Sequence, residues 1–128
     1  MPSTHEKGDL AFAVTISTLI RQGCHVATPL HQHLHYDLIV ECAGKCYRVQ
    51  VKHGAPTGQK VVASLRTIYA RKAGNVVRTR KPDDYDVLAV FHPGLNKVSF
   101  LKSSVLGKSS VTVDFSNEPA TFNVVVGE

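Results

Sequence analysis

The chain has 128 residues, of which 43% are hydrophobic, and a formal net charge of +5. This length suits a single core, so we expect residues 1–128 to form one domain. No apolar run approaches the ~20 residues that a membrane span needs, and the first nine residues lack the apolar centre of a signal peptide. The composition argues against a membrane or secreted protein and predicts a cytoplasmic one.

Positive charge is concentrated in one part of the chain. No acidic residue lies between Gly54 and Pro82, whereas seven basic residues do. An uninterrupted basic segment favours a polyanion such as nucleic acid, with a solvated basic face as the alternative. Six of these residues are candidates for DNA contact: Arg66, Arg71, Lys72, Arg78, Arg80 and Lys81.

The first predicted element is a helix over residues 4–22. Ser3 and Glu6 have capping-box spacing, and Gly23 is a natural stop. The spacing of apolar residues predicts the buried face of this helix. That face comprises Leu10, Ala13, Val14, Ile16, Leu19 and Ile20.

Strands dominate the rest of the chain. "HVATP" and "YDLIVEC" predict strands on either side of a loop in which His31, His33 and His35 alternate. "AGK" turns the second strand into a returning one, "CYRVQVK". The segment of residues 67–84 has no decisive pattern. Further strands are predicted at residues 60–66, 85–93, 97–103, 109–115 and 121–127, which makes the fold α/β or α+β with a mixed sheet.

The three cysteines are expected to be reduced in a cytoplasmic protein. Cys42 and Cys46 flank the turn and can face each other across the hairpin, while Cys24 precedes the first strand. No second pair of closely spaced ligands supports a zinc site. The alternating histidines are interpreted as loop residues near a DNA surface, and Tyr69 and Tyr85 as packing residues.

The strand "CYRVQVK" has two unlike faces. Tyr47, Val49 and Val51 alternate with polar residues that include Gln50 and Lys52. Asp37 opens the neighbouring strand, so the hairpin brings it alongside them. A carboxylate and an amide oxygen suit Mg²⁺, and an ammonium group can orient a water molecule and offset phosphate charge. The pattern predicts a metal and phosphate site.

These residues belong to a longer resemblance. "KGD", "YDL" and "RVQVK" occur in an order and at a spacing that resemble the group I intron-associated (homing) endonucleases of the PD-(D/E)XK nuclease superfamily. The resemblance covers roughly residues 5–102. It implies a restriction-endonuclease-like fold, with a mixed central sheet flanked by helices. It also implies Mg²⁺-dependent hydrolysis of double-stranded DNA, with Mn²⁺ as a substitute.

The resemblance also assigns roles to individual residues. Asp37 would be the main metal ligand, and Gln50 would stand in place of a second acidic ligand. The carbonyl group of Val51 would be a further ligand, and Lys52 would activate or position the attacking water. Asp37, Gln50 and Lys52 are the expected catalytic residues.

One position departs from the family pattern. The family has a glutamate on its first helix where this chain has Phe12. Asp9, three residues earlier, is the possible substitute carboxylate, and Glu6 is a more distant one. An active endonuclease, a catalytically inactive DNA-binding module and a junction-resolving nuclease all stay open.

Cutting both strands of a duplex needs two active sites, so we expect a homodimer or homotetramer. The apolar tail of residues 111–126 is the candidate interface. A final strand packed within one protomer is the alternative.

Overall fold

The computed structural model describes residues 3–127, apart from the side chains of residues 68–71. Arg71 and Tyr69, which have predicted roles, therefore have side chains outside the described part. No helix within residues 3–127 is long and apolar enough to cross a membrane. In chain order, the elements are α1 (Thr4–Arg21), β1 (His25–Ala27), β2 (Leu38–Cys42), β3 (Lys45–His53), β4 (Ala55–Thr57), β5 (Lys60–Ser64), β6 (Arg66–Arg71), β7 (Gly74–Thr79), β8 (Val87–His92), β9 (Lys97–Lys102), a 3₁₀ turn (Ser103–Val105), β10 (Ser110–Asp114) and α2 (Phe122–Val125).

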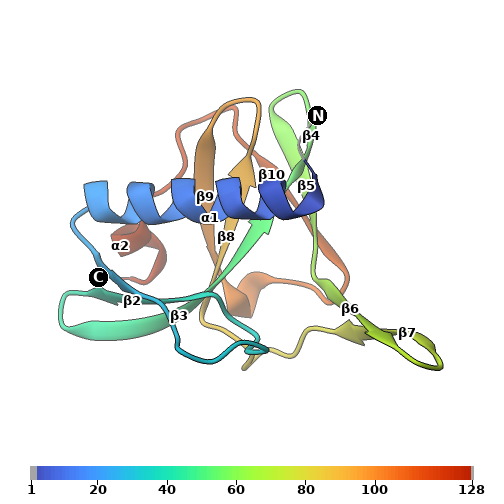
Figure 1. Ribbon diagram of the computed structural model, residues 1–128. Coiled ribbons are helices and arrows are strands. Elements are labelled where there is room, and N and C mark those ends of the chain that lie inside the picture. Colours follow the sequence, from blue (N-terminus) through green and yellow to red (C-terminus); the bar gives the residue numbers. More distant parts are fainter. Residues whose placement is uncertain (1–2, 128) are drawn as a thin grey trace.

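Three layers make up the body of the protein. A five-stranded sheet in the order β1-β2-β3-β8-β9 is covered by α1 on one face (Figure 1). A small sheet of β10, β5 and β4 packs on the opposite face. Strands β3 and β8 are parallel, and the other neighbours in the central sheet are antiparallel. The predicted mixed central sheet is confirmed, with one long helix on one face and strands on the other.

Strand β8 carries apolar residues on both of its faces, so both sides of the central sheet must be covered. All six of its residues are buried, as its uninterrupted apolar sequence predicts. Its odd-numbered residues, including Val87 and Phe91, pack in the core beneath α1. Its even-numbered residues, Leu88 and Val90, pack against the small sheet. Val87, Val90 and Phe91 of β8 and Phe100 of β9 are all buried.

Helix α1 begins with the predicted capping box but buries a different face. The Ser3 side chain accepts from the Glu6 amide, and the Glu6 side chain accepts from the Ser3 amide. Ala11, Thr15 and Leu19, spaced four residues apart, form the buried line. The predicted face is therefore only partly right. Of its members, Leu10 and Ile20 are 47% and 59% exposed.

The C-terminal tail differs from its prediction. Residues 121–127 were expected to form a strand, but the chain forms the short helix α2. Phe122 is fully buried, with its ring in edge contact with those of Tyr47 and Phe100 at centroid distances of 5.6 and 5.4 Å. The tail therefore places Phe115 and Phe122 in the core of its own protomer, and its candidate role in an oligomer interface stays a prediction.

Gly54 permits the crossing from the central sheet to the small one. Its amide donates to the carbonyl oxygen of Phe91 at 2.9 Å. A Cβ atom there would lie 2.7 Å from Cβ of Val61, closer than side chains tolerate. The backbones approach so closely that only glycine fits without movement of the small sheet.

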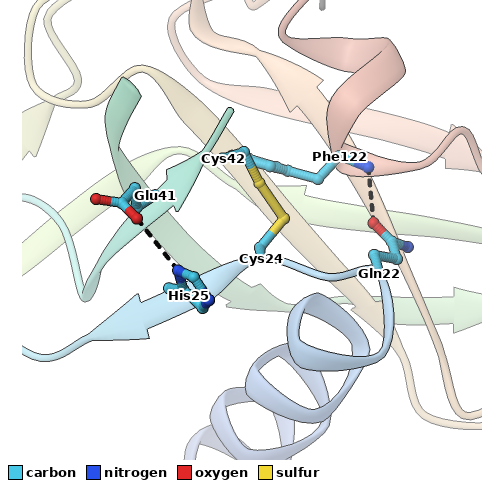
Figure 2. Close-up of a disulfide and its surroundings, with 6 residues drawn as sticks. All are labelled: Gln22, Cys24, His25, Glu41, Cys42 and Phe122. Carbon is cyan, nitrogen blue, oxygen red and sulfur yellow. Dashed lines mark hydrogen bonds and ion pairs between the residues drawn. A yellow bond between two sulfur atoms is a disulfide. The ribbon is translucent and has the colours of Figure 1, made fainter. Parts of the chain in front are cut away.

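The prediction of three reduced cysteines is wrong in this structure. Cys24 and Cys42 form a disulfide, with their Cα atoms 5.1 Å apart (Figure 2). The β1–β2 register pairs His25 with Glu41, which places Cys24 opposite Cys42 at the next position. Cys46 instead pairs with Glu41 on the β2–β3 ladder and is an exposed free thiol. Cross-strand register decides the pairing, and spacing along the hairpin does not.

We expect the disulfide to stabilise the fold. Replacing Cys24 and Cys42 together by serine should lower the free energy of unfolding by about 3 kcal/mol, because the bridge closes a loop of intermediate length in the unfolded chain. Urea unfolding followed by circular dichroism measures the change. Cys46→Ser is the matched control and should leave the unfolding midpoint unchanged. An equal loss in both variants would contradict the assigned pairing.

Candidate active site

Asp37 immediately precedes β2, next to the part of β3 that extends beyond its ladder with β2. Its amide donates to the Val49 carbonyl oxygen at 2.8 Å, and its Oδ2 accepts from the Val51 amide at 2.7 Å. The ladder between β2 and β3 ends at Leu38. Beyond it, the Val51 amide of β3 donates to the Asp37 carboxylate where a longer β2 would offer a main-chain carbonyl. A side chain fixed in this way has little freedom to turn away from β3.

The polar face of β3 meets this carboxylate in a cleft. Asp37, Gln50 and Lys52 all line a cavity of about 180 Å³, which brings the three expected catalytic residues together. The remaining wall comes from the histidine loop, the base of the β6–β7 hairpin and the segment just before β8. The residues lining that wall are His33, Leu34, His35, Leu65, Thr67, Arg78, Arg80, Asp84 and Tyr85.

A second hollow lies on the α1 side of Asp37. It measures about 410 Å³ and is bordered by Asp9, Phe12, Val51 and His53 together with Asp37. Phe12 is half-buried and packs against the core beneath α1. The position that carries glutamate in the resemblance thus lies beside Asp37 and is filled by an apolar ring. Asp9 is exposed at the edge of the same hollow.

Burial pushes the two ionisable groups of the cleft toward their neutral forms. It raises the pKa of Asp37, although the bond from the Val51 amide and the charge of Lys52 oppose the shift. It lowers the pKa of Lys52, and the Asp37 carboxylate opposes that shift. The charge of each group therefore favours the charged form of the other, and a lysine with a lowered pKa is suited to accept a proton.

The donor atoms near Asp37 suit a hard cation. Within residues 3–127, no three histidine, cysteine, aspartate or glutamate side chains are grouped to hold a metal ion. Oxygen donors of other kinds are present in the Gln50 amide and the Val51 carbonyl. Because the N–H and C=O groups of a strand residue point to the same edge, the Val51 carbonyl faces the edge where its amide meets Asp37. Oxygen ligands with one carboxylate fit Mg²⁺ that keeps several waters.

The six predicted DNA-contact residues fall into different environments. Arg66, Lys72 and Lys81 are exposed. Arg80 is only 8% exposed, and its guanidinium group donates to the carbonyl oxygens of Ser103 and Gly107 at 3.1 Å each. These internal bonds favour a structural role for Arg80. The side chain of Arg71 lies outside the described part.

The sequence analysis did not identify Asp84, yet its hydrogen bonds position Arg78 in the lining of the cleft. Its two oxygens accept from both terminal nitrogens of Arg78 at 2.8 and 3.0 Å, and one also accepts from the Lys81 amide at 2.9 Å. The Arg78 hydrogen bond is the main reason why the pKa of Asp84 falls to about 2. An aspartate three residues after Lys81 and just past Pro82 is a turn signal that could have identified it.

Other residues with predicted roles are placed as follows. His33 and His35 border the cleft, and His33 has a left-handed backbone with φ of 69°. Oε1 of Glu41 lies 3.1 Å from Nδ1 of His25, which is on the edge strand β1 (Figure 2). Tyr85 is buried at 4% exposure, which confirms its packing role.

Comparison with known proteins agrees with this geometry. The family described as PD-(D/E)XK endonuclease matches residues 2–121. A solved bacterial homing endonuclease, I-Ssp6803I, is similar over 93% of this chain and 83% of its own, with a TM-score of 0.76 and 23% sequence identity. That likeness confirms the restriction-endonuclease-like fold. No curated protein matches the chain.

We expect the Asp84–Arg78 pair to make stability depend on pH. A carboxylate with a folded pKa of about 2 and an unfolded value of 3.8 stabilises the fold above pH 4 by about 2 kcal/mol. This contribution should be lost as the pH falls from about 4 to 2. Urea unfolding at several pH values measures the effect.

Asp84→Asn should lower stability at neutral pH and flatten this part of the pH profile. Asp83→Asn, at the exposed neighbouring position, is the control and should retain the profile of the unsubstituted protein. An unchanged profile for Asp84→Asn would show that other carboxylates cause the acid sensitivity.

Proposed function

The chain belongs to the PD-(D/E)XK endonuclease family, and we propose that it is a metal-dependent endonuclease of the homing type that hydrolyses phosphodiester bonds of double-stranded DNA. The main support is the convergence of Asp37, Gln50 and Lys52 on one cleft beside a backbone carbonyl. A DNA substrate would place the protein in the compartment that holds the genome.

The proposed ligands of the metal are the Asp37 carboxylate, the Gln50 amide oxygen and the Val51 carbonyl. Mg²⁺ is the expected ion, and Mn²⁺ should replace it, because both accept oxygen ligands. When bound, the ion supplies Lewis-acid stabilisation of phosphate charge and a more acidic water. The hydrogen bond from Val51 to Oδ2 of Asp37 keeps the carboxylate oriented, so its other oxygen is the one available to a cation.

Lys52 is proposed to position the attacking water and accept a proton from it. The water oxygen forms a bond to phosphorus, and the phosphorus–oxygen bond to the leaving nucleotide breaks with its electron pair on that oxygen. Burial lowers the pKa of Lys52, which makes its neutral form more accessible than in an exposed lysine. In its charged form the same group would offset the negative charge on the phosphate.

Phe12 favours a second candidate function, a DNA-binding module without catalysis. An aromatic ring replaces a carboxylate beside Asp37, which leaves little negative charge for a divalent cation. Asp9, at the edge of the same hollow, is the proposed substitute. Activity therefore depends on whether Asp9 and the DNA phosphate together compensate for the missing glutamate.

Phosphate contacts are proposed for three exposed cations. Arg66 and Lys81 are adjacent in sequence to residues that line the cleft, and Lys72 lies at the turn of the β6–β7 hairpin. Arg78 lines the cleft and is oriented by Asp84, so it is proposed to face the phosphate backbone as well. Two protomers are needed to cut both strands, and we therefore propose a homodimer or homotetramer on the duplex.

We expect the cleft residues to control plasmid cleavage in Mg²⁺ or Mn²⁺. Lys52→Ala should reduce the cleavage rate at least about 100-fold, because the water loses its positioning group. Phe12→Glu should raise the rate and lower the Mg²⁺ concentration required, because it adds a carboxylate beside Asp37. Plasmid relaxation on gels measures the rates, and calorimetry measures Mg²⁺ affinity.

Lys97→Ala is the matched lysine control, because Lys97 lies on β9 outside the cleft and pairs with Glu118. It should cleave like the unsubstituted protein. Cleavage by Lys52→Ala at the normal rate would contradict the proposed role. Salt-sensitive DNA binding without cleavage by the unsubstituted protein and Phe12→Glu alike would favour the binding module.

A further inference from the structure

The β6–β7 hairpin is a two-stranded sheet separate from the layers of the body. Its strands pair from Arg66 opposite Thr79 to Arg71 opposite Gly74, and they pack mainly against each other. Figure 1 shows it extending away from the body on the lower right. An isolated two-stranded ribbon is marginally stable in water, so a projecting one is suited to a partner that covers it.

The described residues of β7 leave both of its faces accessible. Adjacent strand residues point to opposite faces, and the adjacent residues Val76 and Val77 are 44% and 55% exposed. Because these valines are so exposed, they contribute little hydrophobic burial to the stability of the fold. A valine on the face that meets DNA is suited to apolar contacts such as those that thymine methyl groups offer in the major groove.

The base of the hairpin is fixed relative to the cleft. Thr67 and Arg78 are directly opposite each other in the ladder, and both line the cleft with Asp37 and Lys52. The Arg78–Asp84 bridge joins the hairpin to the chain just before β8. A phosphate bound in the cleft would therefore place the adjoining duplex along the ribbon.

The dimensions and charge of the ribbon fit a DNA groove. Six residues in β7 span about 20 Å, and the major groove, about 12 Å wide, admits a two-stranded ribbon. The hairpin carries Lys72 at its turn, and no acidic residue occurs between Gly54 and Pro82. Electrostatic attraction would thus hold both the ribbon and its base against the phosphate backbone.

We propose that the β6–β7 hairpin enters the major groove and reads base edges with the face that carries Val76 and Arg78, so that it determines sequence specificity. Alternation along β7 places Val76 on the same face as Arg78, which lines the cleft. Val77 lies on the opposite face. The inference rests on the proposed DNA substrate and does not need the chain to be catalytically active.

Adjacent matched variants test this inference. Val76→Asn and Val77→Asn place the same amide on opposite faces of one strand at similarly exposed positions. The probe is a pool of randomised DNA duplexes, selected by binding in Ca²⁺ to the full chain and then sequenced. Thermal unfolding of each variant checks that the fold is retained.

Val76→Asn should change the preferred base at one or two neighbouring positions by about tenfold or more, because asparagine can pair with adenine. Val77→Asn should leave base preferences within about twofold. A changed preference only in Val77→Asn, no change in either variant, or no sequence preference in the unsubstituted protein would overturn the inference. Loss of cleavage with retained selectivity would count against the nuclease alone, and cleavage with unselective binding would count against the hairpin alone.

Discussion

Alternation along β3 is the constraint on which both the fold and the candidate site depend. Val49 and Val51 face the core beneath α1, whereas Gln50 and Lys52 face the cleft. A shift of one residue in the pairing would exchange these faces and expose the apolar set. The parallel ladder, in which Lys52 pairs with the fully buried Val90, opposes such a shift. Burial of the core therefore also determines which side chains of β3 line the cleft.

In the proposed function, the charge of the cleft would link metal binding to DNA binding. Asp37 is the carboxylate beside Gln50 and Lys52, and Asp84 is already engaged by Arg78. Mg²⁺ is commonly held by one or two carboxylates together with substrate phosphates. A cleft with so little negative charge would gain metal affinity when a phosphate enters, so substrate and ion would favour each other.

Sequence patterns predicted those features of the fold and the site that depend on residues close together in the chain. The β2–β3 hairpin is short, so the meeting of Asp37 with Gln50 and Lys52 followed from strand alternation alone. The Cys24–Cys42 bridge depends on the register of β1 against β2, and the Asp84–Arg78 pair depends on tertiary packing. Neither can be inferred from the spacing of residues along the sequence. The buried line of α1 was not predicted because its middle member, Thr15, is polar and interrupts the apolar spacing of the helix. Five of the six residues of β7 are exposed, so its sequence lacks the apolar alternation that marks a half-buried strand.

The disulfide closes a covalent ring that contains β1, the histidine loop and Asp37. A single peptide-bond break between His31 and His35, in an exposed stretch without regular structure, would leave both fragments joined. The Asp37 carboxylate would stay tied to the main body by β2 as well as by the bridge. Under oxidising conditions a nicked molecule would therefore keep the mass and much of the architecture of the intact one. A reducing agent would leave its two pieces joined only by noncovalent contacts such as the packing of α1 on the central sheet.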